Sequence, residues 1–141
     1  MISGSLEEYL KTIYVLKQNG DKVKVTTIAN KMGLTKPSVN KALKVLKSKE
    51  LINYETYGSI DLTEEGEKLA KKILEAYDIV YIFLTEVLGM EKEEAESQAL
   101  KLKSVLEDNT LNLLTKYVHK LYGIYNLNCD YDINKERCRS C

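Results

Sequence analysis

The residues best suited to chemistry are eight lysines in one short stretch of the chain. Segment 22–49 holds all eight and contains no Asp or Glu. Overall the 141 residues include 21 basic and 21 acidic side chains, so the net charge is zero. The charge is divided, however: residues 1–62 carry 10 Lys/Arg against 6 Asp/Glu, and residues 63–141 carry 11 against 15. This asymmetry favours a phosphate-binding module, although a solvated lysine-rich face would have the same composition.

Three cysteines near the C-terminus form a second group that could do chemistry. They are Cys129, Cys138 and Cys141. The two-residue gap between the last two would let two thiolates bind one Zn²⁺ or one iron of an iron–sulfur cluster. Three ligands are one fewer than a closed structural zinc site needs, so His119, Asp130 or a second subunit would have to supply another. A tail of free thiols over about 124–141 is the alternative.

Composition excludes several classes of protein. A hydrophobic content of 44% with 30% charged residues is typical of a folded domain, and one Pro with seven Gly favours long helices. No apolar run approaches the roughly 18–20 residues of a membrane helix, and residues 1–4 do not resemble a signal peptide. We therefore expect a cytoplasmic protein with no membrane partner. With one histidine and no Ser-His-Asp order, phosphate loop or HExxH motif, we expect no enzyme.

Local signals place the lysines on a helix–turn–helix. The sequence predicts a first helix that starts with a capping box at Ser5 and Glu8 and ends before residues 19–21. A short helix over 25–32 is closed by Gly33, and Thr35 caps a third helix with a proline in its first turn. The expected buried stripes are Ile28, Ala29 and Met32 on the second helix, and Val39, Ala42, Leu43 and Leu46 on the third.

Segments 51–55 and 59–62 alternate with period two around a turn at 56–58, which predicts a hairpin. Three helices followed by a hairpin are typical of a winged helix–turn–helix, which we assign to residues 1–62. On this interpretation the partner is double-stranded DNA. Because segment 22–49 has no arginine, we expect strong backbone binding with modest base readout, and we expect Tyr54 of the wing to lie against the DNA as well. The candidate DNA-binding residues are Lys36, Pro37, Ser38, Asn40, Lys41, Lys44, Lys47, Tyr57 and Gly58.

The second half, residues 63–141, is predicted to be an all-helical dimerisation domain, so the chain as a whole is mainly α. Apolar residues at helical spacing predict helices over 63–88, 91–106 and 108–122. Wide apolar faces of this kind bury well against a second copy, and a two-fold dimer would bind a palindromic operator. The alternative is a monomer in which these helices cover the N-terminal domain.

The order of elements resembles a known family. Residues 5–14, SLEEYLKTIY, and residues 28–66, which end in LTEEG, are similar to the iron- and manganese-dependent repressors, the diphtheria-toxin-repressor and manganese-transport-regulator family. The likeness covers residues 5 to about 122, and the two-domain short form is the nearer match. The resemblance implies a homodimeric DNA-binding repressor of metal uptake genes with Mn or Fe as cofactor.

The metal ligands that the resemblance implies are mostly not matched. Glu8 retains an acidic ligand position, but Lys11 and Tyr77 stand where the family has ligands. An acid–histidine pair of the family falls near Lys103 and Ser104, and Leu100 stands at a further ligand position. Because ammonium groups cannot bind a cation, we expect that the primary metal site is not formed. Lys103, with Lys11, could then replace the cation by holding Glu8 through charge alone.

Two alternative functions follow from the same residues. One is a thiol- or metal-sensing regulator that uses the cysteine cluster, with zinc or an iron–sulfur cluster as cofactor. The other is a winged helix that binds protein rather than DNA. Charge reversal at Lys41 and Lys44 would separate this last possibility from DNA binding.

Overall fold

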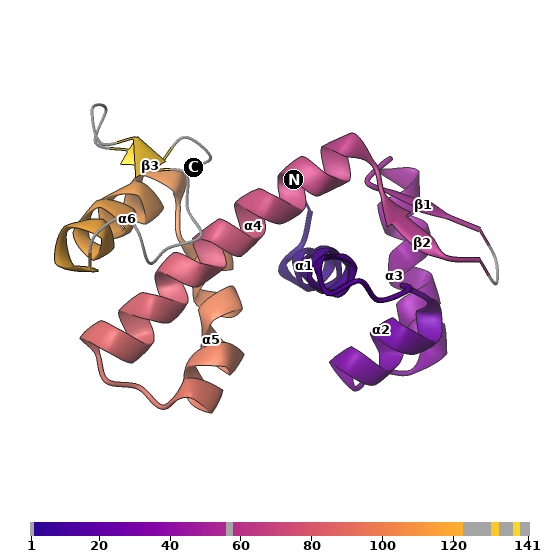
Figure 1. The fold of residues 1–141 in the computed structure, drawn as a ribbon, viewed down its shortest axis with the longest axis horizontal. Coiled ribbons are helices and arrows are strands. Elements are labelled where there is room, and N and C mark those ends of the chain that lie inside the picture. The colour runs from indigo at the N-terminus through magenta and orange to yellow at the C-terminus, as the bar shows by residue number, and fades with distance from the viewer. Residues whose placement is uncertain (1, 56–57, 123–130, 133–136, 139–141) are drawn as a thin grey trace. The chain divides into compact units, whose positions relative to one another are not determined.

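The computed structural model describes residues 2–55, 58–122, 131–132 and 137–138. In these ranges the chain is mainly helical, as predicted, and it separates into two compact units, residues 1–71 and 72–141 (Figure 1). The division falls inside the longest helix. The elements in order are α1 Gly4–Gln18, α2 Val25–Met32, α3 Lys36–Ser48, β1 Ile52–Tyr54, β2 Ile60–Leu62, α4 Glu64–Ile82, a π-helix Phe83–Val87 (η1), α5 Lys92–Val105, α6 Asp108–Tyr122, β3 Tyr131–Asp132 and β4 Arg137–Cys138.

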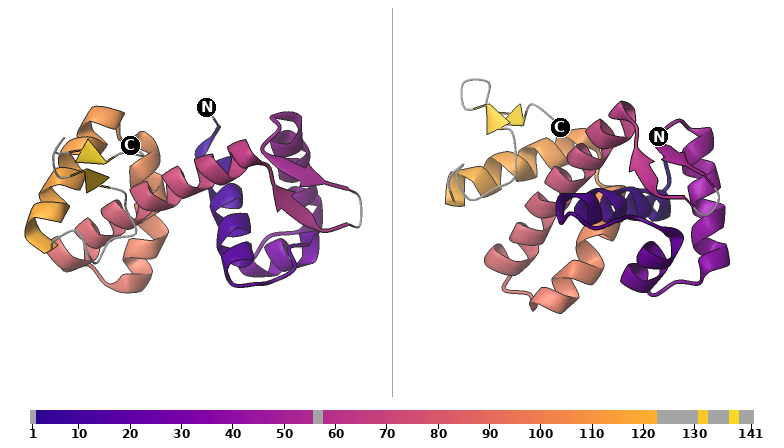
Figure 2. Two further views of the ribbon diagram at one scale, coloured as in Figure 1. Left: turned by 45° about the horizontal axis from the view of Figure 1, so that its top comes forward. Right: turned by 45° about the vertical axis from the view of Figure 1, so that its right-hand side comes forward.

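The first unit is the winged helix–turn–helix that the sequence predicts. Helix α2 ends at Gly33, whose φ of 65° is a left-handed conformation that glycine adopts without steric cost. Strands β1 and β2 pair antiparallel with Ile52 opposite Leu62, and this hairpin lies beside α3 (Figure 2). The core of the unit collects apolar side chains from all these elements: Leu10, Ile13, Leu16, Ile28, Ala29, Val39, Leu43, Leu46, Ile52 and Ile60. Met32 and Ala42, expected in the buried stripes, are only half-buried.

The start of α1 differs from the prediction. Ser3, not Ser5, is the N-cap: its backbone is extended, with φ −67° and ψ 160°, and its hydroxyl accepts the N–H of Leu6 at 3.4 Å. Ser5 already lies inside the first turn, so it cannot occupy the cap position. The predicted capping box is therefore wrong, and the Glu8 side chain is exposed.

The second unit packs helices around a small-residue core. Ala76, Val80 and Leu84 of the α4–η1 segment pack with Ala95, Ala99 and Leu111 of the next two helices. The predicted helix over 63–88 is present, but its last residues, Phe83–Val87, form a π-helix. Beyond α6, β3 and β4 pair antiparallel with Tyr131 opposite Cys138, a hairpin that the sequence did not indicate. No helix in the described ranges is both long and apolar enough to span a membrane.

Candidate nucleic-acid interface

Helix α3 presents a lysine-rich face to solvent. Val39, Leu43 and Leu46 point into the core, which fixes the rotation of the helix and leaves the intervening positions outside. The exposed residues include Lys36, Pro37, Ser38, Lys41, Lys44 and Lys47, all of them candidates from the sequence. A helix face with several ammonium groups and short polar side chains can bind backbone phosphates in a major groove.

Thr35 fixes the first turn of α3. Its hydroxyl oxygen accepts the backbone N–H of Ser38 at 3.4 Å, as expected of an N-cap, and its hydroxyl donates to the Ser38 Oγ at 2.9 Å. This places the Ser38 side chain at the N-terminal end of the helix, with Pro37 beside it in the first turn. A residue there has a defined position, which a contact to DNA would require.

Two hydrogen bonds join the wing to α3. The Tyr54 hydroxyl donates to Oδ1 of the half-buried Asn40, and the Lys47 ammonium donates to the Tyr54 carbonyl at 2.7 Å. The expectation that Tyr54 lies against DNA is wrong, because the residue is only 8% exposed. The cause is the alternation of β1, in which Ile52 and Tyr54 face the core and Asn53 faces out.

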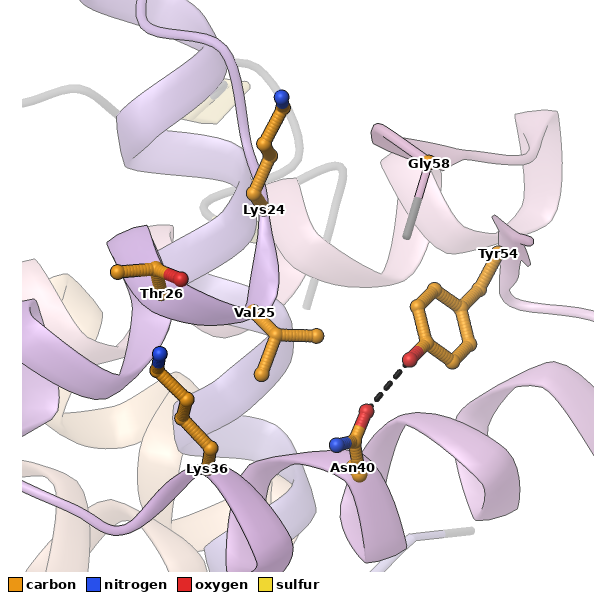
Figure 3. Close-up of a pocket in the computed structure, with 7 residues that line it drawn as sticks. All are labelled: Lys24, Val25, Thr26, Lys36, Asn40, Tyr54 and Gly58. Carbon is orange, nitrogen blue, oxygen red and sulfur yellow. Dashed lines mark hydrogen bonds between the residues drawn. The ribbon is translucent and has the colours of Figure 1, made fainter. Parts of the chain in front are cut away.

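A pocket of about 280 Å³ opens between the wing, the N-terminal end of α2 and α3 (Figure 3). Among the described residues, its lining contains two ammonium groups, two hydroxyls and an amide, and no acidic side chain. The lining residues are Lys24, Val25, Thr26, Lys36, Asn40, Tyr54 and Gly58. Tyr57, predicted to bind DNA from the wing, lies outside the described residues.

Comparison with known proteins assigns the family. Residues 1–60 match the family model described as the iron dependent repressor, N-terminal DNA binding domain, and residues 63–122 match its metal binding and dimerisation domain. An uncharacterized HTH-type transcriptional regulator of Methanocaldococcus jannaschii is 37% identical over 120 residues, which are 84% of this chain and 96% of that protein. The chain belongs to the iron-dependent repressor family.

More distant relatives agree with this assignment. The HTH-type transcriptional regulator MntR of Lysinibacillus sphaericus is 26% identical over 84% of either chain, and the transcriptional regulator MntR of Escherichia coli O157:H7 is 30% identical over 82% of this chain and 74% of that one. The structure of the manganese regulator SloR superposes with a TM-score of 0.74 at 27% identity. That match covers 81% of this chain and 53% of the other, so this chain spans about half the length of that structure.

Among the described residues, no three His, Cys, Asp or Glu side chains gather where they could hold a metal ion. Glu8 is exposed, whereas Lys11 and Lys103 are half-buried. Burial, followed by the charges of Glu96 and Asp78, raises the pKa of Tyr77 from 10.0 to about 12. Cys129 and Cys141 lie outside the described residues, as does the Cys138 side chain, so the expected cysteine cluster is outside them too.

Several residues at the site were missed from the sequence. Lys24 and Thr26 line the pocket, although the sequence gave them no role beyond the basic stretch and the second helix. Their positions in the sequence could have indicated this role, because Lys24 directly precedes α2 and Thr26 lies in its first turn. In the second unit, outside this site, Thr115 is buried on α6, as is His119, which the sequence offered as a possible further zinc ligand.

Proposed function

We propose that this chain is a homodimeric transcriptional repressor that binds a palindromic DNA operator through α3 and the wing. The observation that carries the proposal is the exposed face of α3, where Lys36, Lys41 and Lys44 stand beside a wing that is hydrogen-bonded to the same helix. Lysine ammonium groups neutralise phosphates and release counterions, so binding of this kind weakens steeply as salt concentration rises. The match of residues 1–60 to a DNA-binding domain supports the same function.

The test is charge reversal on α3. Fluorescence anisotropy with a labelled duplex, repeated across a range of salt concentrations, gives both the affinity and its salt dependence. The double variant Lys41→Glu/Lys44→Glu should lose at least about tenfold in affinity, and the slope of log K against log salt should fall by about two. The matched control is Lys92→Glu/Lys101→Glu, two exposed lysines of α5 in the other unit. If the two double variants had the same DNA affinity and the same salt dependence, a winged helix that binds protein would be favoured instead.

The homodimer is proposed from α6. Leu113, Tyr117 and Leu121 are 58%, 48% and 51% exposed, and they recur every fourth residue along one face of the helix. An apolar stripe of this kind is suited to a copy of itself across a two-fold axis. The match of residues 63–122 to a metal binding and dimerisation domain supports this assignment. Two α3 helices related by such an axis would contact half-sites about one DNA turn apart, hence the palindrome.

We further propose that DNA binding by this chain does not depend on the metal that the family description implies. Among the positions that the resemblance assigns to ligands, Glu8 can bind a cation. The other positions supply no further carboxylate or imidazole; they hold Lys11, Tyr77, Leu100 and Lys103 or Ser104. An ammonium group cannot bind Mn²⁺ or Fe²⁺, and a neutral phenol is not among the carboxylate, imidazole and carbonyl ligands that these ions prefer. These residues do not fit the family's divalent ion.

A further inference from the structure

The carboxamide of Asn40 has a fixed orientation in the first unit. Its Oδ1 accepts the hydrogen bond from the Tyr54 hydroxyl, so that oxygen is turned toward the wing. The amide nitrogen therefore points away from Tyr54, as Figure 3 shows. Asn40 lines the pocket between α2, α3 and the wing, and it is the only side-chain amide in the part of the lining that the structure describes. It consequently presents hydrogen-bond donors to this pocket.

This orientation changes what Asn40 can recognise on DNA. An asparagine that reads adenine uses its oxygen to accept from N6 and its nitrogen to donate to N7 at the same time. The Tyr54 hydroxyl uses one of the two lone pairs of Oδ1, so that oxygen keeps one acceptor site. Both N–H donors of Asn40 stay available, and they can bind an acceptor such as a phosphate oxygen.

The rest of the lining favours an anion as the acceptor. Lys24 and Lys36 contribute ammonium groups and Thr26 contributes a hydroxyl, whereas none of the described residues that line the pocket is Asp or Glu. Val25 gives the pocket an apolar part that can contact a sugar. A phosphate group attached to deoxyribose matches this combination of donors, positive charge and apolar surface.

We propose that this pocket binds a backbone phosphate of DNA, with Asn40 as a donor to a phosphate oxygen and Tyr54 as the residue that positions Asn40. The proposal rests on the proposed DNA-binding function and adds a residue-level assignment to it. Asn40 then contributes affinity for any DNA sequence and carries no base specificity. Tyr54 contributes without touching the DNA, through the hydrogen bond that holds the amide in its donor orientation.

Three variants of the full-length protein test this assignment. Asn40→Asp replaces the donors with a second carboxylate oxygen facing the pocket, Asn40→Ala removes the side-chain amide, and Tyr54→Phe removes only the hydroxyl and keeps the buried ring. The readout is anisotropy with an operator duplex, a panel of its single base-pair variants and an unrelated duplex. Asn109→Asp, at an exposed position of α6, controls for the added charge, and Tyr14→Phe controls for the lost hydroxyl.

We expect Asn40→Asp to weaken binding at least about tenfold and Asn40→Ala about two- to tenfold, each by the same factor on every duplex. Tyr54→Phe should cost about two- to fivefold in the wild-type background and nothing in the Asn40→Ala background, because its effect passes through Asn40. A purely structural role for Tyr54 would give the same loss in both backgrounds. Thermal unfolding of each variant gives its folded fraction at the assay temperature.

Two results would overturn the assignment. One is a loss in the Asn40 variants that is confined to one base-pair position, because that would make Asn40 a base-reading residue. The other is a Tyr54→Phe effect that persists without the Asn40 amide. Inorganic phosphate at constant ionic strength is a competitor for the pocket. If a DNA phosphate occupies the pocket, inorganic phosphate should displace DNA from the wild type more strongly than chloride does, and this difference should disappear in Asn40→Asp. Failure of the proposed DNA-binding function would be distinguishable from failure of this assignment. In that case the wild type would bind no duplex even at low salt.

Discussion

Gly66, in the first turns of α4, lies directly against the backbone carbonyl of Leu51. A Cβ atom placed on Gly66 would be 1.9 Å from that oxygen and 2.9 Å from the carbonyl carbon. The same junction is held by Thr63, whose N–H donates to the Leu51 carbonyl at 3.1 Å and whose hydroxyl donates to the Glu50 carbonyl at 2.7 Å. The start of α4 is thereby attached to the segment that joins α3 to the wing.

We predict that Gly66→Ala destabilises the protein. Alanine favours a helix over glycine by about 1 kcal/mol, but here its methyl group would overlap backbone atoms that cannot rotate away. Overpacking of this kind costs about 1–3 kcal/mol or more, so the net free energy of unfolding should fall. Urea denaturation followed by circular dichroism measures it. Glu65→Ala, at the exposed neighbouring position, should change stability by less than about 0.5 kcal/mol. A variant as stable as the wild type would contradict the close contact.

Much of the first unit could be predicted from the sequence because its signals are local. Gly33 closes α2 and Thr35 caps α3 through contacts within three or four residues, which a sequence pattern can represent. The start of α1 was misplaced because Ser3 and Ser5 both suit an N-cap, and only the extended backbone of Ser3 decides between them. Boundaries of this kind depend on geometry that residue type alone does not fix.

The candidate site was harder to predict because its contacts join distant residues. That Tyr54 shares a face with Ile52 follows from the alternation of β1, so its burial had a signal in the sequence. Its hydrogen bond to Asn40, fourteen residues away, depends on how the wing packs on α3, and no local pattern encodes that packing. The π-helix at Phe83–Val87 likewise had no signal, because its apolar spacing is that of an ordinary helix continuing from α4.

Tyr77 predicts a loss of stability at alkaline pH. Its pKa is raised to about 12, first by burial and then by the charges of Glu96 and Asp78. A folded pKa above the unfolded value of 10.0 means that the contribution to stability is full below pH 10 and is lost as pH rises toward 12. Tyr77→Phe should therefore lose less stability than the wild type between pH 9 and pH 11.5, measured as urea midpoints. Tyr14→Phe, at a half-buried position of α1 outside the surface that we assign to the dimer, should follow the wild type. Parallel curves for the wild type and Tyr77→Phe would contradict the raised pKa.

The apolar stripe of α6 predicts a change in oligomeric state. Leu113→Glu/Leu121→Glu places two carboxylates on the surface that we assign to the dimer, where they would lose their hydration without gaining partners. Light scattering coupled to size exclusion should show a shift from dimer to monomer at micromolar concentration. Lys120→Glu changes an exposed neighbour on the same helix and should leave the dimer intact. If the double variant stays dimeric, the interface lies elsewhere in the chain.

The chemistry at the family's ligand positions predicts DNA binding without metal. Of these positions Glu8 alone offers a carboxylate, and ammonium groups at Lys11 and Lys103 would repel a cation. Operator affinity measured in excess chelator should therefore stay within about twofold of that measured with added Mn²⁺ or Fe²⁺, a change of less than about 0.5 kcal/mol. Glu8→Gln, which removes the retained carboxylate from an exposed position of α1, should bind DNA as the wild type does. Lys41→Glu/Lys44→Glu serves as the positive control for lost affinity. The prediction would be wrong if chelation abolished DNA binding and added Mn²⁺ restored it. If Glu8→Gln then prevented this restoration, the dependence on metal would act through Glu8.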